Sequence, residues 1–591
     1  MSKILVVGNV VKDVYLNLDS EQNAFEEDEA GVNWLDLSFD GSKHNFFRRT
    51  AVFAGARVTR EVLESFHHHV KIAAEDKIAA DYRYILCKDD QITYLSPAIR
   101  RPTAWQAPTE TYDWIYVDRS ATLSMELVQN IQSYMAISPR TRLAYYAHSN
   151  MNGTEESLAR IATLVFADDN LRKADIPQYR GLFCHISMNN IVLEGIEQSW
   201  KQTRARTDLM THLTIYSIIA GTVFAALTDG RNVKDSLLLA KMSIENAALN
   251  EVLPPEKLDR LVMEYQKDLM NLRLIASSAV SKGILAADES GGSIHKKFEQ
   301  AGIPDDEAHR RDYRNIFFTT DGLEKYVSGV ILFNETARQR ADDGSTFTEF
   351  LTRKGIIPGI KVDQGLVNFP DSEEKYTCGL DGLPERLAEY HEMGLRFAKW
   401  RAAFEVVPPS ERAIQKNCEI LAQYAKNCQD ALIVPIVEPE VVHDGNYSIE
   451  TCAEVTGKIL DELFRQLAAK RVDLAACILK CNMVLAGKQY PEQSSPEEVG
   501  QRTAAVLRAH VPAELAGVVF LSGGQGVEQA TDNLQQVTNN GPFPWPVTFS
   551  FARALQGPAL DAWQGHNENA NRAREAFHAR LVANADALKK H

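Results

Sequence analysis

Residues 433–440 read Ile-Val-Pro-Ile-Val-Glu-Pro-Glu, an apolar run that ends in two glutamates. A short apolar run of this length is typical of a buried strand. Side chains two positions apart along a strand face the same side, so Glu438 and Glu440 share one face. The stretch therefore predicts a buried strand that brings two carboxylates to its carboxyl end.

Seven further apolar runs accompany this one in the C-terminal part of the chain, and helical patterns separate them. The eight predicted strands are 283–287, 329–333, 357–362, 396–402, 432–438, 476–484, 518–521 and 547–551. The helices between them include 385–393, 410–428, 449–470 and 496–510. Eight strand–helix units in about 300 residues are typical of a parallel (β/α)8 TIM barrel, which we predict for residues 265–591.

Charged residues follow most of these strands. They are Asp288 and Glu289, Lys361 and Asp363, Lys399 and Arg401, Glu438 and Glu440, Lys480, and Arg553. In such a barrel the carboxyl ends of all strands meet at one mouth, where active sites lie. We therefore expect these side chains to form one convergent site.

The lysines indicate the chemistry of this mouth. Neighbouring ammonium groups repel one another, which drives one lysine toward its neutral form. A neutral lysine is a nucleophile that forms a Schiff base with a carbonyl, and the carboxylates beside it can move the protons. This chemistry requires no cofactor and no metal, and the histidines show no spacing that is typical of a zinc site.

Two groups of residues indicate phosphate binding. Residues 521–526 read Leu-Ser-Gly-Gly-Gln-Gly; the glycines let consecutive backbone N–H groups face an anion, and Ser522 adds a hydroxyl. Arg553 brings a guanidinium beside this loop, in the part of the barrel that usually binds phosphate. The second group, on the other side, consists of Lys361, Ser290, Ser293 and Lys297. Two phosphate sites around a Schiff-base lysine suit an open-chain sugar bisphosphate.

Seven motifs occur in order along this part of the chain. They are Gly-Ile-Leu-Ala-Ala-Asp-Glu-Ser at 283–290, Gly-Val-Ile-Leu-Phe at 329–333, Phe-Ala-Lys-Trp-Arg at 397–401, the stretch 433–440, Leu-Lys-Cys-Asn-Met at 479–483, Phe-Leu-Ser-Gly-Gly at 520–524, and Thr-Phe-Ser-Phe-Ala-Arg at 548–553. Together they resemble the motifs of class I fructose-1,6-bisphosphate aldolases. The resemblance implies reversible cleavage of fructose 1,6-bisphosphate to dihydroxyacetone phosphate and glyceraldehyde 3-phosphate.

The resemblance also implies a role for each matching residue. Lys480 would form the Schiff base, with Lys399 beside it to help with the carbinolamine. Glu438 would shuttle protons during dehydration, Glu440 would support the site electrostatically, and Asp288 would receive the C4-hydroxyl proton. The implied substrate-binding residues are Lys361, Arg401, Ser290, Ser293, Lys297, Ser522, Gly523, Ala552 and Arg553.

Two positions depart from the family's pattern. Lys297 stands where arginine is usual, which weakens two-pronged phosphate binding, and Ala552 replaces a usual glycine but keeps its backbone N–H.

The substrate's stereochemistry stays open, because tagatose 1,6-bisphosphate differs only at C4. A non-catalytic scaffold or metabolite sensor is a further alternative, which the complete set of lysines and carboxylates disfavours for this part of the chain.

Residues 1–250 show a different pattern, in which strands and helices alternate as in a mostly parallel α/β sheet. We expect strands at 4–11, 82–87, 112–117, 142–146 and 162–166, and helices at 125–135 and 233–249. Two prolines at 254–255 interrupt the pattern, so we predict a linker over 251–264 and a helix over 257–278. The uncharged stretch 209–228 contains several polar residues and predicts a buried helix rather than a membrane span.

Two motifs of this part resemble ribokinase-like (PfkB-type) sugar kinases. They are Gly-Asn-Val-Val-Lys-Asp at 8–13 and Phe-Ala-Gly-Ala-Arg at 53–57, which make Asp13 and Gly55 candidate ligand-binding residues. The family's late Gly-Ala-Gly-Asp motif carries the catalytic base, but the matching residues 214–217 are Thr-Ile-Tyr-Ser. We therefore expect a degenerate kinase domain that serves structure, assembly or ligand sensing. The alternative is a bifunctional enzyme that phosphorylates a sugar and then cleaves it.

The composition limits the class of protein. The chain has 591 residues, a net charge of −15 and 45% hydrophobic residues, which fits a globular protein and argues against a general nucleic-acid binder. Eight cysteines without zinc-site spacing predict reduced thiols, and three consecutive histidines at 67–69 predict a polar loop or strand start rather than a metal site. We expect a cytoplasmic homo-oligomer that acts on a small sugar bisphosphate and binds neither nucleic acid nor membranes.

Overall fold

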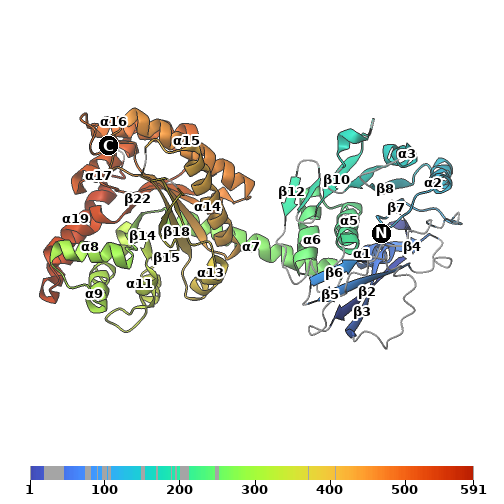
Figure 1. The fold of residues 1–591 in the computed structure, drawn as a ribbon, viewed down its shortest axis with the longest axis horizontal. Helices are drawn as coiled ribbons and strands as arrows, with labels where there is room; N and C mark the ends of the chain where they lie inside the picture. Colours follow the sequence, from blue (N-terminus) through green and yellow to red (C-terminus); the bar gives the residue numbers. More distant parts are fainter. Residues whose placement is uncertain are drawn as a thin grey trace. The chain divides into compact units, whose positions relative to one another are not determined.

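The computed structural model divides the chain into two compact units, Met1–Tyr265 and Gln266–His591. It describes residues 2–589 except 9, 19–45, 74–80, 89–90, 96–102, 104, 106–107, 148–152, 168–170, 177, 188–189, 194–195, 200–211, 247–251, 371 and 406. Helix α7 (Pro255–Ala279) contains the boundary between the units (Figure 1). Most of the segment 251–264, which we predicted as a linker, is therefore helical.

An eight-stranded sheet forms the centre of the first unit, in the order β12-β11-β10-β9-β8-β7-β1-β4. The strands from β4 to β10 pair in parallel, whereas β11 and β12 are antiparallel additions at one edge. The bounds are β1 (Lys3–Val7), β4 (His69–Ile72), β7 (Trp114–Val117), β8 (Arg142–Ala147), β9 (Leu164–Ala167), β10 (Leu182–Ile186), β11 (Asn190–Leu193) and β12 (Ile196–Ser199). The expected mostly parallel sheet is thus present.

A separate four-stranded sheet has the order β3-β2-β5-β6, with the bounds β2 (Val10–Leu18), β3 (Phe46–Gly55), β5 (Asp81–Lys88) and β6 (Gln91–Leu95). The prediction of one strand over 4–11 is wrong, because β1 and β2 belong to different sheets. The break lies at Gly8, where a Cβ would come within 2.8 Å of the Ser120 Oγ and 2.9 Å of the Asp118 Cβ. Only a residue without a side chain fits between the two strands without a shift of these neighbours.

The helices of the first unit are α1 (Ala56–Ser65), α2 (Met125–Ile137), α3 (Gly153–Ile161), α5 (His212–Thr228) and α6 (Val233–Asn246). Helix α5 is buried along residues 215–226, which confirms the predicted buried helix over its described part. No helix within the described residues is long and apolar enough to cross a membrane. Of the three histidines, His68 is buried and its ring nitrogen lies 3.1 Å from the Thr228 hydroxyl, and His69 begins β4, so the predicted strand start is confirmed.

The second unit is a closed barrel of eight parallel strands. The strands are β13 (Gly283–Ala287), β14 (Val327–Leu332), β15 (Ile357–Lys361), β18 (Phe397–Phe404), β19 (Val434–Val441), β20 (Ile478–Cys481), β21 (Gly517–Phe520) and β22 (Val547–Phe551). All eight predicted strands are present, which confirms the TIM barrel. The bounds differ most at 432–438, where β19 begins two residues later and ends three residues later, and at 476–484, where only residues 478–481 form β20.

Helices surround the barrel (Figure 1), and a short hairpin of β16 (Leu366–Asn368) and β17 (Lys375–Thr377) follows β15. The helices are α8 (Gly291–Ala301), α9 (Glu307–Phe318), α10 (Leu323–Tyr326), α11 (Asn334–Arg338), α12 (Phe347–Arg353), α13 (Leu383–Glu392), α14 (Glu411–Asp430), α15 (Ile449–Ala469), α16 (Pro496–His510), α17 (Val527–Asn539), α18 (Arg553–Trp563) and α19 (Ala570–Asp586). Ser410, Ser448 and Ser495 fix the starts of α14, α15 and α16, because each hydroxyl accepts a hydrogen bond from a backbone N–H of the first turn.

An apolar cluster fills the barrel near the amino ends of its strands. It includes Ile284, Phe397, Val434 and Ile478, and the last turns of α7 contribute Leu272 to it. Because this cluster closes one end, polar side chains can gather only toward the carboxyl ends. The Phe397 ring occupies space beside two glycines: a Cβ at position 359 would lie 2.2 Å from the ring, and one at position 329 would lie 3.0 Å from it.

We predict that Gly359→Ala destabilises the barrel by about 1–3 kcal/mol, because the new methyl group overlaps a ring that is fully buried. Urea unfolding measures the change. The matched control is Gly292→Ala in α8, where no atom lies within 4 Å of the new Cβ, and this variant should be as stable as the parent or slightly more so. Equal stability of the two variants would contradict the prediction.

Candidate active site at the barrel mouth

A cavity of about 320 Å³ opens at the carboxyl ends of the barrel strands. Its lining contains all five residues that the resemblance assigned to catalysis, as well as six of the nine predicted substrate-binding residues; Lys361, Arg401 and Ser290 are not among the lining residues. The lining residues are Ala286, Asp288, Glu289, Ser293, Lys297, Lys399, Glu438, Glu440, Lys480, Leu521, Ser522, Gly523, Ser550, Ala552 and Arg553. The expected convergence of the strand ends is therefore present.

Four buried charges form the centre of the cavity. The Lys399 Nζ lies 2.7 Å from the Asp288 Oδ2 and 3.2 Å from the Glu438 Oε2. The other Glu438 oxygen, Oε1, lies 3.0 Å from the Lys480 Nζ. Each of these residues comes from a different strand or strand end, β13, β18, β19 or β20. The result is a chain of alternating charges, Asp288–Lys399–Glu438–Lys480, along which protons can move.

The pKa values follow from this alternation. Burial alone would raise the pKa of Asp288, but the positive charges of Lys399 and Lys480 lower it to about 2. The pKa of Glu438 is lowered for the same reason, against its burial. The pKa of Lys399 is raised, because Asp288 and Glu438 outweigh the burial that would lower it. For Lys399, the expected repulsion between lysines is thus weaker than the attraction of the carboxylates.

A second layer of ion pairs lies beside the first. The Arg401 guanidinium pairs with Glu440, and the Lys361 Nζ lies 2.6 Å from the Asp363 Oδ1. Lys361 and Lys399 are register partners on the neighbouring strands β15 and β18. Asp363 is buried, with 6% of its side chain exposed. The sequence analysis placed it on the same strand face as Lys361 but did not include it among the predicted site residues. It neutralises one of the two cations that the barrel places side by side.

Glu289 organises the neighbouring part of the mouth. Its Oε1 lies 2.5 Å from the Lys297 Nζ, and its Oε2 lies 2.8 Å from the Arg314 Nη2. The Lys297 ammonium also contacts the Gln556 Oε1 at 3.0 Å. The predicted phosphate ligand Lys297 therefore lines the cavity but already has a carboxylate partner. Sequence reasoning missed Arg314, because nothing in the helical pattern of α9 distinguishes this arginine from Arg310 and Arg311 on the same helix.

The loop 521–526 follows β21, and its residues Leu521, Ser522 and Gly523 line the same cavity. The hydroxyl-bearing Ser522 is 6% exposed, and within the described residues the backbone N–H groups of Ser522, Gly523 and Gly524 donate no hydrogen bond. Arg553 begins α18 close by and forms no ion pair with the described residues. Free N–H groups beside an unpaired guanidinium at a helix start form a site for an anion. Ser290 and Ser293 follow β13, their hydroxyl oxygens 3.2 Å apart, and Ser293 lines the cavity.

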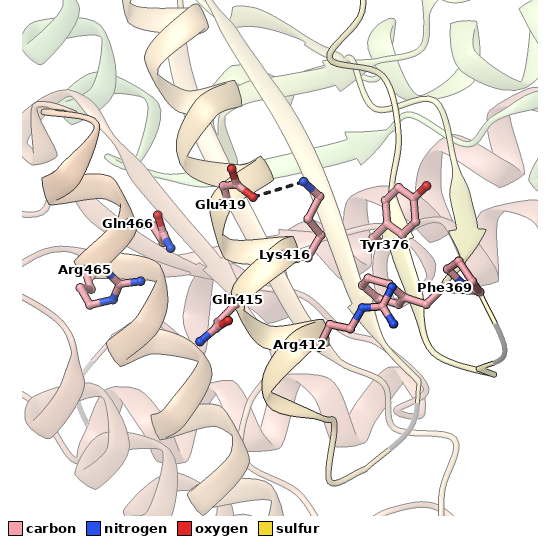
Figure 2. Close-up of a pocket in the computed structure, with 9 residues that line it drawn as sticks. Phe369, Tyr376, Arg412, Gln415, Lys416, Glu419, Arg465 and Gln466 are labelled. Carbon is pink, nitrogen blue, oxygen red and sulfur yellow. Dashed lines mark hydrogen bonds and ion pairs between the residues drawn. The ribbon is translucent and has the colours of Figure 1, made fainter.

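A larger cavity of about 580 Å³ lies elsewhere on the barrel (Figure 2). The hairpin β16–β17 and the helices α14 and α15 form it, and its lining contains none of the predicted site residues. The charged side chains here are exposed, and Lys416 pairs with Glu419 on the same helix. Unlike the mouth, this groove contains no buried charged side chains of opposite sign in contact with one another among its lining residues, so it is the weaker candidate for acid–base chemistry.

The two candidate residues of the first unit have a described backbone only. Asp13 lies in β2 opposite Val52, and Gly55 ends β3 opposite Val10. Their side-chain surroundings lie outside the described part of the structure, so the predicted ligand contacts of Asp13 and Gly55 stay predictions. Thr214-Ile-Tyr-Ser217 lies inside α5 and thus forms part of a buried helix rather than a glycine-rich loop.

We predict that Asp288→Asn reduces the pH dependence of folding stability between about pH 4 and pH 2. A carboxylate whose folded pKa lies near 2, against an ordinary 3.8, adds stability above pH 4 that is lost as the pH falls toward 2. The shift of this pKa contributes about 2 kcal/mol to the free energy of unfolding above pH 4. Urea unfolding of the parent and the variant at several pH values measures it. An unchanged dependence would contradict the ion pair with Lys399.

Comparison with known proteins agrees with the geometry of the mouth. Residues 271–591 match the family model "Fructose-bisphosphate aldolase class-I". The chain is 46% identical to fructose-bisphosphate aldolase 1 of Toxoplasma gondii over 330 residues, which cover 55% of this chain and 90% of that protein. It is 44% identical to aldolase C-B of Danio rerio over 56% of this chain and 92% of that protein.

A solved structure gives the same result for the fold. The fructose-bisphosphate aldolase of Plasmodium falciparum, crystallised with TRAP and a small-molecule inhibitor, superposes with a TM-score of 0.54 and 45% identity. The match covers 55% of this chain and 95% of that one. Motifs, barrel and matched sequence agree, and the chain belongs to the class I fructose-bisphosphate aldolase family.

Proposed function

We propose that the barrel cleaves fructose 1,6-bisphosphate reversibly to dihydroxyacetone phosphate and glyceraldehyde 3-phosphate through a Schiff base on Lys480. The observation that carries this assignment is the buried contact of 3.0 Å between the Lys480 Nζ and the Glu438 Oε1. A carboxylate at hydrogen-bond distance can take a proton from the amine and return it to the hydroxyl that leaves as water.

The reaction follows from the order of the charges. The Lys480 amine attacks the C2 carbonyl to give a carbinolamine, and Glu438 transfers the proton that releases water and leaves a protonated imine. Asp288, ionised at neutral pH, accepts the C4-hydroxyl proton, and the electrons of the C3–C4 bond move into the imine. Lys399, held between Asp288 and Glu438, stabilises both carboxylates before and after each transfer.

We propose that two groups of residues around the cavity bind the substrate's two phosphates. We assign one phosphate to the loop side, where Ser522, Gly523, Ala552 and Arg553 provide a hydroxyl, N–H groups and a guanidinium. We assign the other to the side of Lys361, Ser290 and Ser293, with Lys297 at its edge. Arg401, which is paired with the lining residue Glu440, is a further cation that we assign to the substrate's hydroxyls.

Borohydride reduction tests the Schiff base. In the presence of substrate, mass spectrometry of the reduced protein should find one covalent adduct on Lys480, because reduction makes the imine permanent. Lys480→Ala should lose this adduct and at least about a thousandfold of the cleavage rate, since the nucleophile is gone. Lys458→Ala, which changes an exposed lysine on α15, is the matched control and should react like the parent. An adduct that persists without Lys480 would place the chemistry on another residue.

For residues 1–250 we propose a ribokinase-like sugar-kinase domain that has lost its catalytic base. Support comes from the mostly parallel sheet and the separate four-stranded sheet. At the position of the base, the Ser217 hydroxyl lies 3.5 Å from the Asp118 Oδ2. Asp118 is 1% exposed and already accepts hydrogen bonds from the Thr59 and Ser120 hydroxyls, at 2.5 Å and 2.6 Å. A carboxylate that is buried and occupied in this way is poorly placed to activate a sugar hydroxyl.

We predict that the whole chain consumes no ATP with a panel of hexoses and hexose phosphates, in an assay that couples ADP formation to NADH oxidation. The reason is that positions 214–217, Thr-Ile-Tyr-Ser, contain no aspartate that could act as the catalytic base. The Lys480→Ala variant serves as the assay protein, because it removes aldol cleavage as a source of background. Sugar-dependent ATP consumption by this variant would contradict the degenerate domain and favour the bifunctional kinase–aldolase.

The cellular assignments are proposals of the same kind. We propose a cytoplasmic enzyme, and one similar protein, of Arabidopsis thaliana, is named a cytosolic aldolase. The net charge of −15 disfavours nucleic-acid binding. The expected homo-oligomer stays a prediction.

A further inference from the structure

His443 lies directly behind the loop 521–526. It follows β19 by two residues and is 8% exposed. Its ring faces Gly524, where a Cβ would lie 2.6 Å from the His443 Nδ1 and 3.1 Å from its Cγ. Gly524 has a φ of +67°, the left-handed region that turns the chain of the loop sharply. The imidazole therefore occupies the space in which any larger residue at 524 would place its side chain.

The ring presents a polar atom to this contact. The His443 Nδ1 is buried and has no hydrogen-bond partner among the described residues. A buried polar atom without a partner is unfavourable, and an apolar side chain of similar size would avoid this cost. A narrow cavity of about 10 Å³ lies beside it, lined by Glu440, Gly523 and Gln525 among others. The empty space beside His443 is thus too small for a further side chain.

The backbone of His443 connects the loop to the strand of the reactive lysine. The His443 carbonyl accepts a hydrogen bond of 2.8 Å from the Lys488 N–H, and the Gly487 N–H donates to the Tyr447 carbonyl at 2.8 Å. The segment 485–488 continues from β20, which contains Lys480. His443 is therefore fixed from one side by the β20 segment and contacts the anion-binding loop with its other side.

The surroundings of His443 favour the neutral form of its imidazole. Burial lowers the pKa of His443 below its ordinary value, and the positive charges of Lys488 and Arg553 lower it further. A hydrogen bond to the Ala486 backbone and the negative charge of Asp444 raise the pKa, but they do not outweigh these effects. A neutral ring packs against a glycine backbone without adding a charge that would require a partner of its own.

We propose that His443 is a positioning residue that holds the loop 521–526 in its anion-binding form, an inference that rests on the proposed phosphate role of that loop. The imidazole supports Gly524 from behind, so that the N–H groups of Ser522, Gly523 and Gly524 stay turned into the mouth. The residue does not touch the reacting atoms. Its loss should weaken the hold on one phosphate in the ground state and the transition state alike, which raises KM and leaves kcat unchanged.

The test compares His443→Ala with His443→Asn, which keeps atoms near the positions of Cγ and Nδ1 that face Gly524. In His443→Ala we expect KM for fructose 1,6-bisphosphate to rise about tenfold, kcat to stay within twofold, and the inhibition constant of inorganic phosphate to rise with KM. His443→Asn should recover most of this loss. His391→Ala, which changes a partly buried histidine on α13, is the matched control and should keep both constants. Unchanged KM in a folded His443→Ala variant would overturn the proposal.

A purely structural role would give a different result. It would lower kcat and thermal stability together, would not be relieved by asparagine, and would overturn the proposal as well. A double-mutant cycle with Gly524→Ala supplies the second measurement: the new methyl group collides with the ring, so the KM defect of Gly524→Ala should be smaller in the His443→Ala background. Additive defects would contradict the contact.

Arg553→Ala separates this inference from the proposed function. If Arg553→Ala raises KM and His443→Ala does not, the inference about His443 fails and the phosphate site stands. If Arg553→Ala leaves KM unchanged, the assignment of the phosphate to the loop side fails, and the proposal for His443 fails with it.

Discussion

The ammonium group of Lys399 lies between the carboxylates of Asp288 and Glu438, and the arrangement of the mouth depends on this shared position. Charges buried this deeply are stable only when opposite charges and hydrogen bonds compensate their loss of water. Each partner comes from a different strand or strand end, so the pairing constrains the register of the barrel. A shift of β18 by one residue would turn Lys399 out of the mouth, because side chains alternate between the two faces of a strand.

The apolar end of the barrel supplies the second constraint. Phe397 and its neighbours fill the interior near the amino ends of the strands, and glycines at 329 and 359 leave room for the ring. This packing holds the strands rigidly while their carboxyl ends carry the charges. The proposed catalytic groups therefore sit on strands or strand ends, which are rigid elements of the fold, whereas the proposed phosphate site includes a loop, for which we propose support from His443.

Sequence periodicity was sufficient to predict the eight strands and the charged residues at their ends, because both depend on local pattern. It was not sufficient for contacts that join distant segments. The phosphate ligand predicted at Lys297 pairs with Glu289, and Arg314 completes that cluster from a helix whose pattern looks ordinary. The break between β1 and β2 was missed for the same reason, since it depends on the contact of Gly8 with Asp118 and Ser120, more than 100 residues away in the chain.

The two units surround a buried carboxylate with different partners, cations in the barrel and hydroxyl groups in the first unit. This difference supports the roles that we propose for the two units. In the barrel, Asp288 is balanced by lysine ammonium groups, which keep it ionised and able to accept a proton from a substrate that enters between them. In the first unit, hydroxyl groups of Thr59 and Ser120 surround Asp118, and no described cation pairs with it. Hydroxyl donors satisfy the carboxylate without creating a path to a substrate. The proposed roles of the two aspartates, reactive in the barrel and structural in the first unit, therefore follow from the partners that each fold supplies.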